Sequence, residues 1–227
     1  GDYNTTIGYE TGANLLSDSN VAIGRRALTA FSNSGGGYNV AIGALAMQST
    51  ADVAAFANVC VGYGAGTAIN SADADGTVAI GHAAGAGITD GAGNLFIGRE
   101  AGDAITTGDR NVAIGYTAFS TSIVSSLDNI AIGYNAMNGS GTTAASERNV
   151  AIGNYTMNGN QNNSSKNVAV GHLAMNALTL GDHNVAVGDE AANDLTTGRY
   201  NTAFGSEALK AETIGDGSVA FGHNALF

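Results

Sequence analysis

The chain has 227 residues, a formal net charge of −11, 34 glycines, and no proline or tryptophan. The acidic balance excludes nucleic acid and anionic membrane surfaces as natural partners, because binding to them draws on clustered Lys and Arg. Only 12% of residues are charged, and much of the 44% hydrophobic fraction is alanine and valine, so the composition argues against an ordinary globule with a wide core.

The chain is built from one short unit that recurs thirteen times. Each unit closes with a glycine, and successive closing glycines lie 16 to 20 residues apart: Gly8, Gly24, Gly43, Gly62, Gly81, Gly98, Gly115, Gly133, Gly153, Gly171, Gly188, Gly205 and Gly222. A short period of this kind is typical of a solenoid, in which each unit forms one coil. Because the units account for the whole chain, the sequence predicts a single repeat domain over residues 1–227.

Within each unit, the residues before the glycine have the chemistry of a short β-strand. Eleven units carry asparagine four residues before the glycine, and the other two carry Thr77 and Ser218. An aliphatic residue follows, then a small one, then Ile, Val or Phe, which favours a strand closed by a turn. Alanine recurs three residues after the glycine, and Leu, Met or Phe is common at the fourth position. A second short strand is expected there.

Stacking these units predicts an all-β fold, a parallel β-solenoid or β-roll of about thirteen coils of 16–20 residues. Each coil would contain two short strands and two turns, and the coils would stack about 4.8 Å apart into a rod about 60 Å long. Like residues then lie above one another. The stacked asparagines are expected to bond to each other through their side-chain amides: Asn4, Asn20, Asn39, Asn58, Asn94, Asn111, Asn129, Asn149, Asn167, Asn184 and Asn201.

The alternation of side chains along a strand predicts which columns face the core, because Val and Ile point to one side and Asn and Ala to the other. We expect the Val and Ile columns to be enclosed and the alanine column to lie outside: Ala22, Ala41, Ala79, Ala113, Ala131, Ala151, Ala169, Ala186, Ala203 and Ala220. A long apolar stripe is rarely left in water, so this column is predicted to be the interface of a cyclic oligomer. Asp at Ala113 and Ala131 should then dissociate the oligomer, whereas Asp at Ser122 and Ser125 should not.

The repeated motif resembles a known family. Residues 20–24 (Asn-Val-Ala-Ile-Gly) followed by Ala27, and residues 111–115 followed by Ala118, are similar to the head repeats of trimeric autotransporter adhesins. The longer units, with Thr-Thr-Gly linkers at 106–108 and 196–198, resemble the repeat arrays of bacteriophage tail fibres. The resemblance covers all thirteen units. It implies a left-handed parallel β-roll, packed or intertwined as a homotrimer, in an extracellular fibre of a bacterial surface or a virion.

No residue pattern points to catalysis, a cofactor or a metal ion, so the chain is not expected to be an enzyme. His82, His172 and His223 follow closing glycines in distant units and are expected at exposed turns, as is His183. Segment 72–76 only faintly resembles a calcium-binding roll repeat and is interpreted as a loop. Segment 62–66 is glycine-rich but lacks the following helix that a phosphate loop needs. Cys60, the single cysteine, is expected to be a small buried thiol.

One column is a candidate recognition surface. It directly follows the closing glycines and holds Tyr9, Arg25, Tyr63, His82, Arg99, Tyr116, Tyr134, His172 and His223. These residue types are favoured in binding surfaces, and a cell-surface receptor or glycan is the partner that they would fit. The alternative is that a turn exposes whatever residues are soluble there. An ice-binding solenoid is a remote alternative, because the Thr residues cluster in linkers and form no regular column.

The sequence therefore predicts a structural fibre or adhesin module, a rigid homotrimeric rod that mediates attachment to a host or partner cell. The alternative is a purely structural filament subunit that stacks end to end with identical subunits or flanking fibre domains, since the first and last units are in phase and lack a polar capping repeat. Direct membrane insertion is not expected, because no apolar stretch approaches the roughly 20 residues that span a bilayer. A charged and apolar leader is likewise not recognised.

Overall fold

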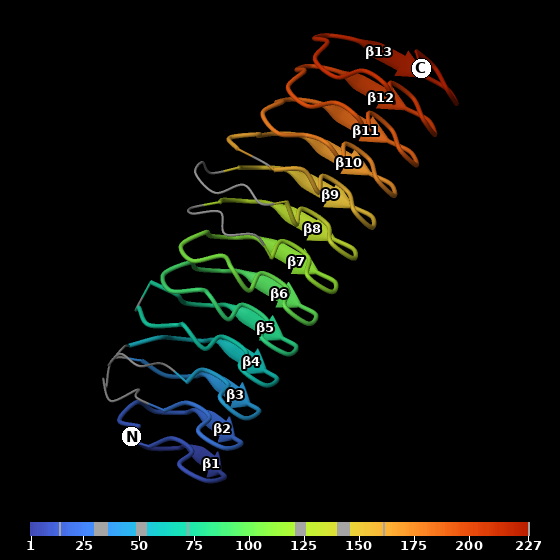
Figure 1. The fold of residues 1–227 in the computed structure, drawn as a ribbon. Helices are drawn as coiled ribbons and strands as arrows, with labels where there is room; N and C mark the ends of the chain where they lie inside the picture. The colour runs from blue at the N-terminus through green and yellow to red at the C-terminus, as the bar shows by residue number, and fades with distance from the viewer. Residues whose placement is uncertain are drawn as a thin grey trace.

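The computed structural model describes residues 1–13, 15–29, 36–48, 54–71, 73–120, 126–139, 146–160 and 162–226. One three-residue strand lies in each repeat unit, and coil n is named here after its strand βn. The strands are β1 (Thr5–Ile7), β2 (Val21–Ile23), β3 (Val40–Ile42), β4 (Val59–Val61), β5 (Val78–Ile80), β6 (Leu95–Ile97), β7 (Val112–Ile114), β8 (Ile130–Ile132), β9 (Val150–Ile152), β10 (Val168–Val170), β11 (Val185–Val187), β12 (Thr202–Phe204) and β13 (Val219–Phe221). They follow one another in chain order along a rod (Figure 1).

The thirteen strands form one parallel sheet in which each strand pairs with the next one along the chain. Every pairing brings like positions together, as where Val40 lies opposite Val59 and Ile42 opposite Val61. Twelve steps of about 4.8 Å make the sheet about 58 Å long. The predicted parallel solenoid of thirteen stacked coils is therefore confirmed.

The second strand predicted in each coil was wrong. After the closing glycine, the second and fourth positions adopt left-handed backbone angles, as at Leu45 (φ 64°) and Met47 (φ 47°). Two such residues interrupt an extended strand, and the chain forms turns there. Hydrogen bonds between coils continue through the turns: Leu45 N donates to the Arg25 carbonyl of the preceding coil, and Met47 N to the Ala65 carbonyl of the following one.

The closing glycine is required by the close spacing of the coils. The φ angles of the thirteen closing glycines lie between +125° and +143°, a region that residues with a side chain rarely adopt. Gly24 illustrates a second constraint, because a Cβ atom there would stand 2.6 Å from the carbonyl oxygen of Gly43. A methyl group at this position would therefore push neighbouring coils apart.

The alanine column lies inside the coil, so its predicted position on the outer surface was wrong. The ten alanines are at most 2% exposed: Ala22, Ala41, Ala79, Ala113, Ala131, Ala151, Ala169, Ala186, Ala203 and Ala220. Side chains alternate as predicted, but the direction is inverted. The coil is thin, so only a small side chain fits opposite a turn whose residues carry side chains. The asparagines, which point the same way, find their hydrogen-bond partners inside. The loop positions Ser122 and Ser125 lie outside the described residues.

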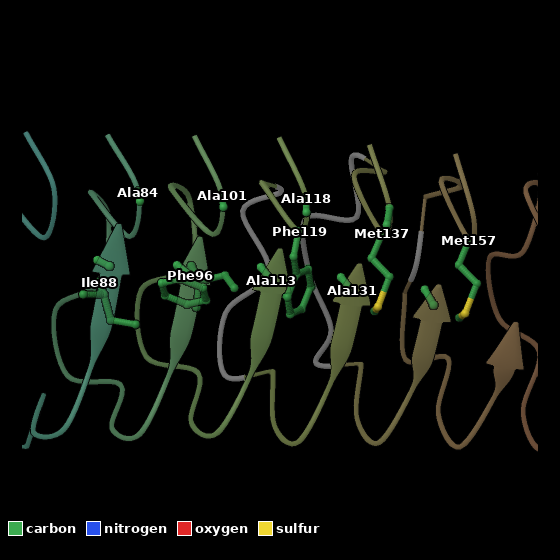
Figure 2. Packing of buried hydrophobic residues seen from close by; sticks show 14 of the residues in the cluster. Ala84, Ile88, Phe96, Ala101, Ala113, Ala118, Phe119, Ala131, Met137 and Met157 are labelled. Atoms are coloured by element: carbon green, nitrogen blue, oxygen red, sulfur yellow. The ribbon is translucent and has the colours of Figure 1, made fainter. Parts of the chain in front are cut away.

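Large core side chains come from two positions in the coil. Phe119, Met137 and Met157 enter the core from the fourth position after the closing glycine (Figure 2). Coils 4, 5 and 6 have glycine at that position and bury an isoleucine three residues later: Ile69, Ile88 and Ile105. Each of these coils therefore buries at least one large apolar side chain in its core.

Phe96 shows how closely the core volume is balanced. It replaces alanine at the centre of β6 and is fully buried. The neighbouring turn positions are Gly85 and Gly102, where an added Cβ would stand 2.8 Å and 2.5 Å from the Phe96 ring. The ring thus occupies space that side chains fill in other coils, as close packing of the core requires (Figure 2).

Candidate interaction surface

The predicted asparagine ladder is confirmed, and it is buried. Asn129 Nδ2 donates to Asn111 Oδ1 (3.1 Å) and to the Ser146 carbonyl (2.8 Å), and Asn129 N also donates to Asn111 Oδ1 (3.1 Å). The same amide-to-amide bonds link Asn4 to Asn58 and Asn94 to Asn201 along the rod. Because the ladder asparagines beyond the first coil are at most 1% exposed, they stabilise the stack and offer no contact surface.

Two short polar side chains mark where the ladder changes. Thr77 N donates to Asn58 Oδ1 (2.8 Å), while the Thr77 hydroxyl donates to the Gly91 carbonyl (3.4 Å). Ser218 N likewise donates to Asn201 Oδ1 (2.8 Å). In both residues the backbone N–H donates to the preceding ladder asparagine, as in the other coils. Neither residue has a side-chain amide with which to extend the ladder.

The first and third residues of each strand form what we call the outward face. They are mainly Val and Ile, and they remain partly exposed: Ile80 is 38%, Ile152 37% and Phe204 45% exposed. None of the thirteen strands contains a charged residue. An uncharged aliphatic strip along a rod of this length exceeds what monomers usually leave in water, so it is a candidate contact surface.

Two further columns border this face. The N-rim is the residue directly before each ladder position, and the C-rim is the residue directly after each closing glycine. Tyr3, Tyr38, Tyr200, Arg110, Arg148, Lys166 and His183 belong to the N-rim, and Tyr9, Tyr63, Tyr116, Tyr134, Arg25, Arg99, His82, His172 and His223 to the C-rim. The rims therefore hold seven of the eight tyrosines, all four histidines and five of the eight Lys and Arg residues, but only Asp128 and Asp189 of the nineteen acidic residues.

The candidate recognition column is the C-rim, and the structure brings its central members together. Tyr63 and His82 stack with ring centroids 5.2 Å apart, the Arg99 guanidinium lies 5.4 Å from the Tyr116 ring, and Tyr116 lies 5.6 Å from Tyr134. Tyr9, Arg25 and His223 occupy the same column near the two ends of the rod, with Tyr9 67% exposed.

Tyr155 is a member of this surface that the sequence reasoning missed. Its ring lies 5.1 Å from Tyr134 and 6.4 Å from His172, and so connects the stripe across coil 9. It follows Asn154, the C-rim residue of that coil, by one position. Only the left-handed turn at Tyr155 (φ 56°) returns its ring to the column, and a fixed sequence offset could not reveal this.

The histidines do not gather around a common point. His172 Nδ1 lies 3.0 Å from Asp189 Oδ1 in the next coil, and both side chains are more than half exposed. Among the described residues, no three His, Cys, Asp or Glu side chains are placed to hold a metal ion. In segment 72–76, Ala72 lies outside the described residues, and Asp75 Oδ1 accepts a hydrogen bond from Phe56 N (2.7 Å).

Two ionisable groups are shifted by burial. Burial raises the pKa of the Cys60 thiol to about 12, as expected for a thiol enclosed by the core. Partial burial, reinforced by the nearby Glu100 carboxylate, raises the pKa of Asp103. On the surface, the hydrogen bond from Arg110 instead holds the pKa of Asp128 below its usual value.

Comparison with models of known families, with curated proteins and with solved structures finds no match to this chain. Within the residues that the structure describes, no helix is long and apolar enough to cross a membrane. The fold and its surfaces are therefore the basis on which a function is assigned.

Proposed function

We propose that this chain is a rigid segment of an extracellular fibre, assembled as a homotrimer, which mediates attachment to a host or partner cell. The observation that carries the proposal is the unbroken register of thirteen coils beneath one uncharged aliphatic face. Because the coils stack in register, they form a rod about 58 Å long. The apolar face along this rod is expected to be buried against a partner.

The cover is best supplied by further copies of the chain. The outward face runs along the whole rod, so a partner must be equally long and equally straight, and an identical rod meets both conditions. Cyclic symmetry about an axis parallel to the rod closes such faces around a shared apolar core. The number three and the bacterial or viral setting rest on the resemblance of the repeats to adhesin heads and tail-fibre arrays.

The attachment role is supported by the exposed aromatic and cationic residues of the C-rim. Tyrosine and arginine are enriched at binding surfaces, where they combine a large contact area with hydrogen bonding. A repeated stripe on three chains would allow individually weak contacts to add through avidity. A surface glycan or protein receptor is the partner class that this chemistry fits.

The proposal is tested by sedimentation, electron microscopy and binding to a glycan array and to cells. A discrete trimer with rods near 60 Å long supports it if the trimer binds cells or glycans, and if changing Tyr116 and Tyr134 to Ser removes binding while the protein remains trimeric. A stable monomer contradicts the assembly. Long filaments without cell or glycan binding indicate a purely structural subunit and contradict the attachment role.

A further inference from the structure

We propose that neighbouring chains of the oligomer join rim to rim in register, so that the C-rim residue of each coil contacts the N-rim residue of the same coil in the next chain. This inference rests on the proposed assembly and specifies its partner, a second copy, and the residues that meet. It assigns one side of the rim residues to the interface between chains, while the side of the C-rim that faces away from the shared core stays available to a receptor.

The direction of the strands dictates which rims meet. The N-rim residue lies two positions before the strand and the C-rim residue two positions after it, so the rims border opposite ends of the strand. When identical outward faces are arranged in a ring, the end of one strand approaches the beginning of its neighbour's strand. A pure rotation about the rod axis also leaves each coil at the same height as its copies.

Within one chain, the two rims of a coil are separated by an extended strand. The two rim residues of a coil are six positions apart, on either side of the three-residue strand, and an extended chain of that length spans roughly 20 Å, which is too far for direct contact between their side chains. Any match between the two rims of one coil is therefore unexplained by contacts inside the chain. Contact between two copies supplies a physical cause for such a match.

The rims are matched in size. In coils 5 and 6, Gly76 faces His82 and Gly93 faces Arg99 under the proposed pairing. In coil 3 the order is reversed, because Tyr38 stands in the N-rim and Ala44 in the C-rim. No coil places Gly, Ala or Ser in both rims, so each junction holds at least one larger side chain to fill it.

Two of the junctions with large residues in both rims are also matched in chemistry. Coil 7 would place the Arg110 guanidinium beside the Tyr116 ring, a favourable cation and aromatic pair. Coil 11 would place His183 beside the Asp189 carboxylate. These side chains are exposed, and each already contacts a neighbour in its own rim, as where Arg110 donates to Asp128 (2.7 Å). The neighbouring chain would meet the sides that face solvent in the single chain.

A shift by one coil in either direction is less favourable. Pairing each C-rim residue with the N-rim residue of the following coil would bring Arg99 against Arg110 and leave Ala44 against Ala57. The opposite shift would leave Ala44 against Ser19. Like charges or two small residues at one junction each weaken an interface.

Disulfide cross-linking tests the register. In a Cys60→Ala background, Ala57→Cys and Tyr63→Cys are introduced together, and the purified oligomer is oxidised and examined by denaturing electrophoresis without reductant. The two new cysteines cannot join within one chain, because their Cα atoms are much farther apart than the roughly 7 Å limit. The matched control combines Ala44→Cys with Ala57→Cys, which are offset by one coil.

We expect several-fold more covalent dimer and trimer from the in-register pair than from the offset pair. Sedimentation of the reduced proteins is the second readout. If both proteins are trimeric but the offset pair cross-links equally or better, or neither pair cross-links, the rim pairing is overturned while the fibre assembly stands. If the chain is monomeric in both variants and in the unaltered protein, the assembly itself is refuted.

Discussion

At the scale of single residues, the closing glycines and the alanine column decide how closely the coils approach. Glycine is retained where a Cβ would collide with the backbone of the next coil, and alanine where the strand faces the turn across a thin core. Residues with side chains nevertheless occupy many left-handed positions, as at Met137 (φ 51°) and Tyr200 (φ 59°). The packing of the stack therefore offsets a conformational cost of about 1 kcal/mol or more at each such residue.

Replacing Gly115 with alanine should destabilise the rod strongly. The new Cβ would stand under 3.0 Å from the carbonyl oxygen of Gly133, and the φ angle of +139° is strained for alanine. We expect a loss of roughly 3 kcal/mol in the free energy of unfolding, measured by denaturant titration. Gly76→Ala is the control: its φ angle is +68° and no atom lies within 4 Å of its Cβ, so about 1 kcal/mol is expected. Equal losses would contradict the steric explanation.

Asp103→Asn should stabilise the protein at neutral pH. Partial burial raises the pKa of Asp103, so the folded state binds the proton more tightly than the unfolded state. The folded-state stabilisation that comes from this tighter proton binding is fully present at pH values below the unfolded pKa, about 3.9. It is lost as the pH rises through the raised pKa of the folded state. The gain at pH 7 should be at most about 1 kcal/mol because solvent screens the half-exposed group.

The pH dependence distinguishes this explanation for Asp103 from a general packing effect. Thermal unfolding of both proteins between pH 3 and pH 7 should show a difference that shrinks as the pH falls. Asparagine already occupies the same position two coils later, where Asn138 Oδ1 accepts a hydrogen bond from the Ser120 hydroxyl (2.9 Å). The substitution therefore introduces a side chain that this position accommodates. A difference that is constant with pH would assign the effect to something other than ionisation.

At the scale of the coil, the strand supplies only three residues and the asparagine ladder supplies much of the specificity. Ladder bonds run from coil to coil, so each coil depends on its neighbours, as in other repeat proteins. The buried amides also explain the inverted facing of the strands. An asparagine placed on the outward side would lose its partners, whereas Val and Ile tolerate an exposed position at lower cost.

Asn129→Ala should remove several interactions together. Asn129 donates to Asn111 and Ser146, and its Oδ1 accepts from Asn149 N (3.0 Å) and Asn149 Nδ2 (3.2 Å). Leaving these buried groups unpaired should cost about 3 kcal/mol or more in unfolding free energy. Asn154→Ala, at an exposed position, should cost under about 1 kcal/mol, and hydrogen exchange should locate the loss in coils 7 to 9 only for Asn129. An equal effect of the two variants would show that the ladder is not the stabilising element.

At the scale of the whole molecule, the rod is held together by nearest-neighbour stacking, and its polar and apolar surfaces are divided lengthwise. The interior holds alanine, methionine and the ladder, while the outward face holds Val and Ile between two rims rich in tyrosine, histidine and arginine. Residues that stabilise the single chain are thus separated from those proposed to join chains. This separation makes folding and assembly distinguishable by mutation.

Ile114→Asp with Ile132→Asp should dissociate the oligomer into folded monomers, because both side chains lie on the outward face. Ala113→Asp with Ala131→Asp should instead unfold coils 7 and 8, since these alanines are fully buried and each carboxylate would be enclosed without a partner. Sedimentation reports the assembly, and circular dichroism reports the fold. Folded monomers from the alanine variant would restore the alanine column as the interface.

Some of this architecture was determined by the sequence alone. The recurrence of Asn, an aliphatic residue, Ala and Gly indicated thirteen coils, parallel register and the ladder, because these properties follow from periodicity and hydrogen-bonding capacity. The exposed C-rim was identifiable for the same reason, since a constant offset from the closing glycine places all its members at one turn.

Only the tertiary structure decided the facing of the columns, the absence of the second strand from the described turns, and the place of Tyr155 beside Tyr134. Strand alternation separates Val and Ile from Asn and Ala, but it is symmetric between inside and outside. The choice depends on how much space the coil encloses and on where the buried amides find partners. Those quantities arise from left-handed turns at residues such as Leu45 and Met47, whose backbone angles are imposed by stacking and not by their own side chains.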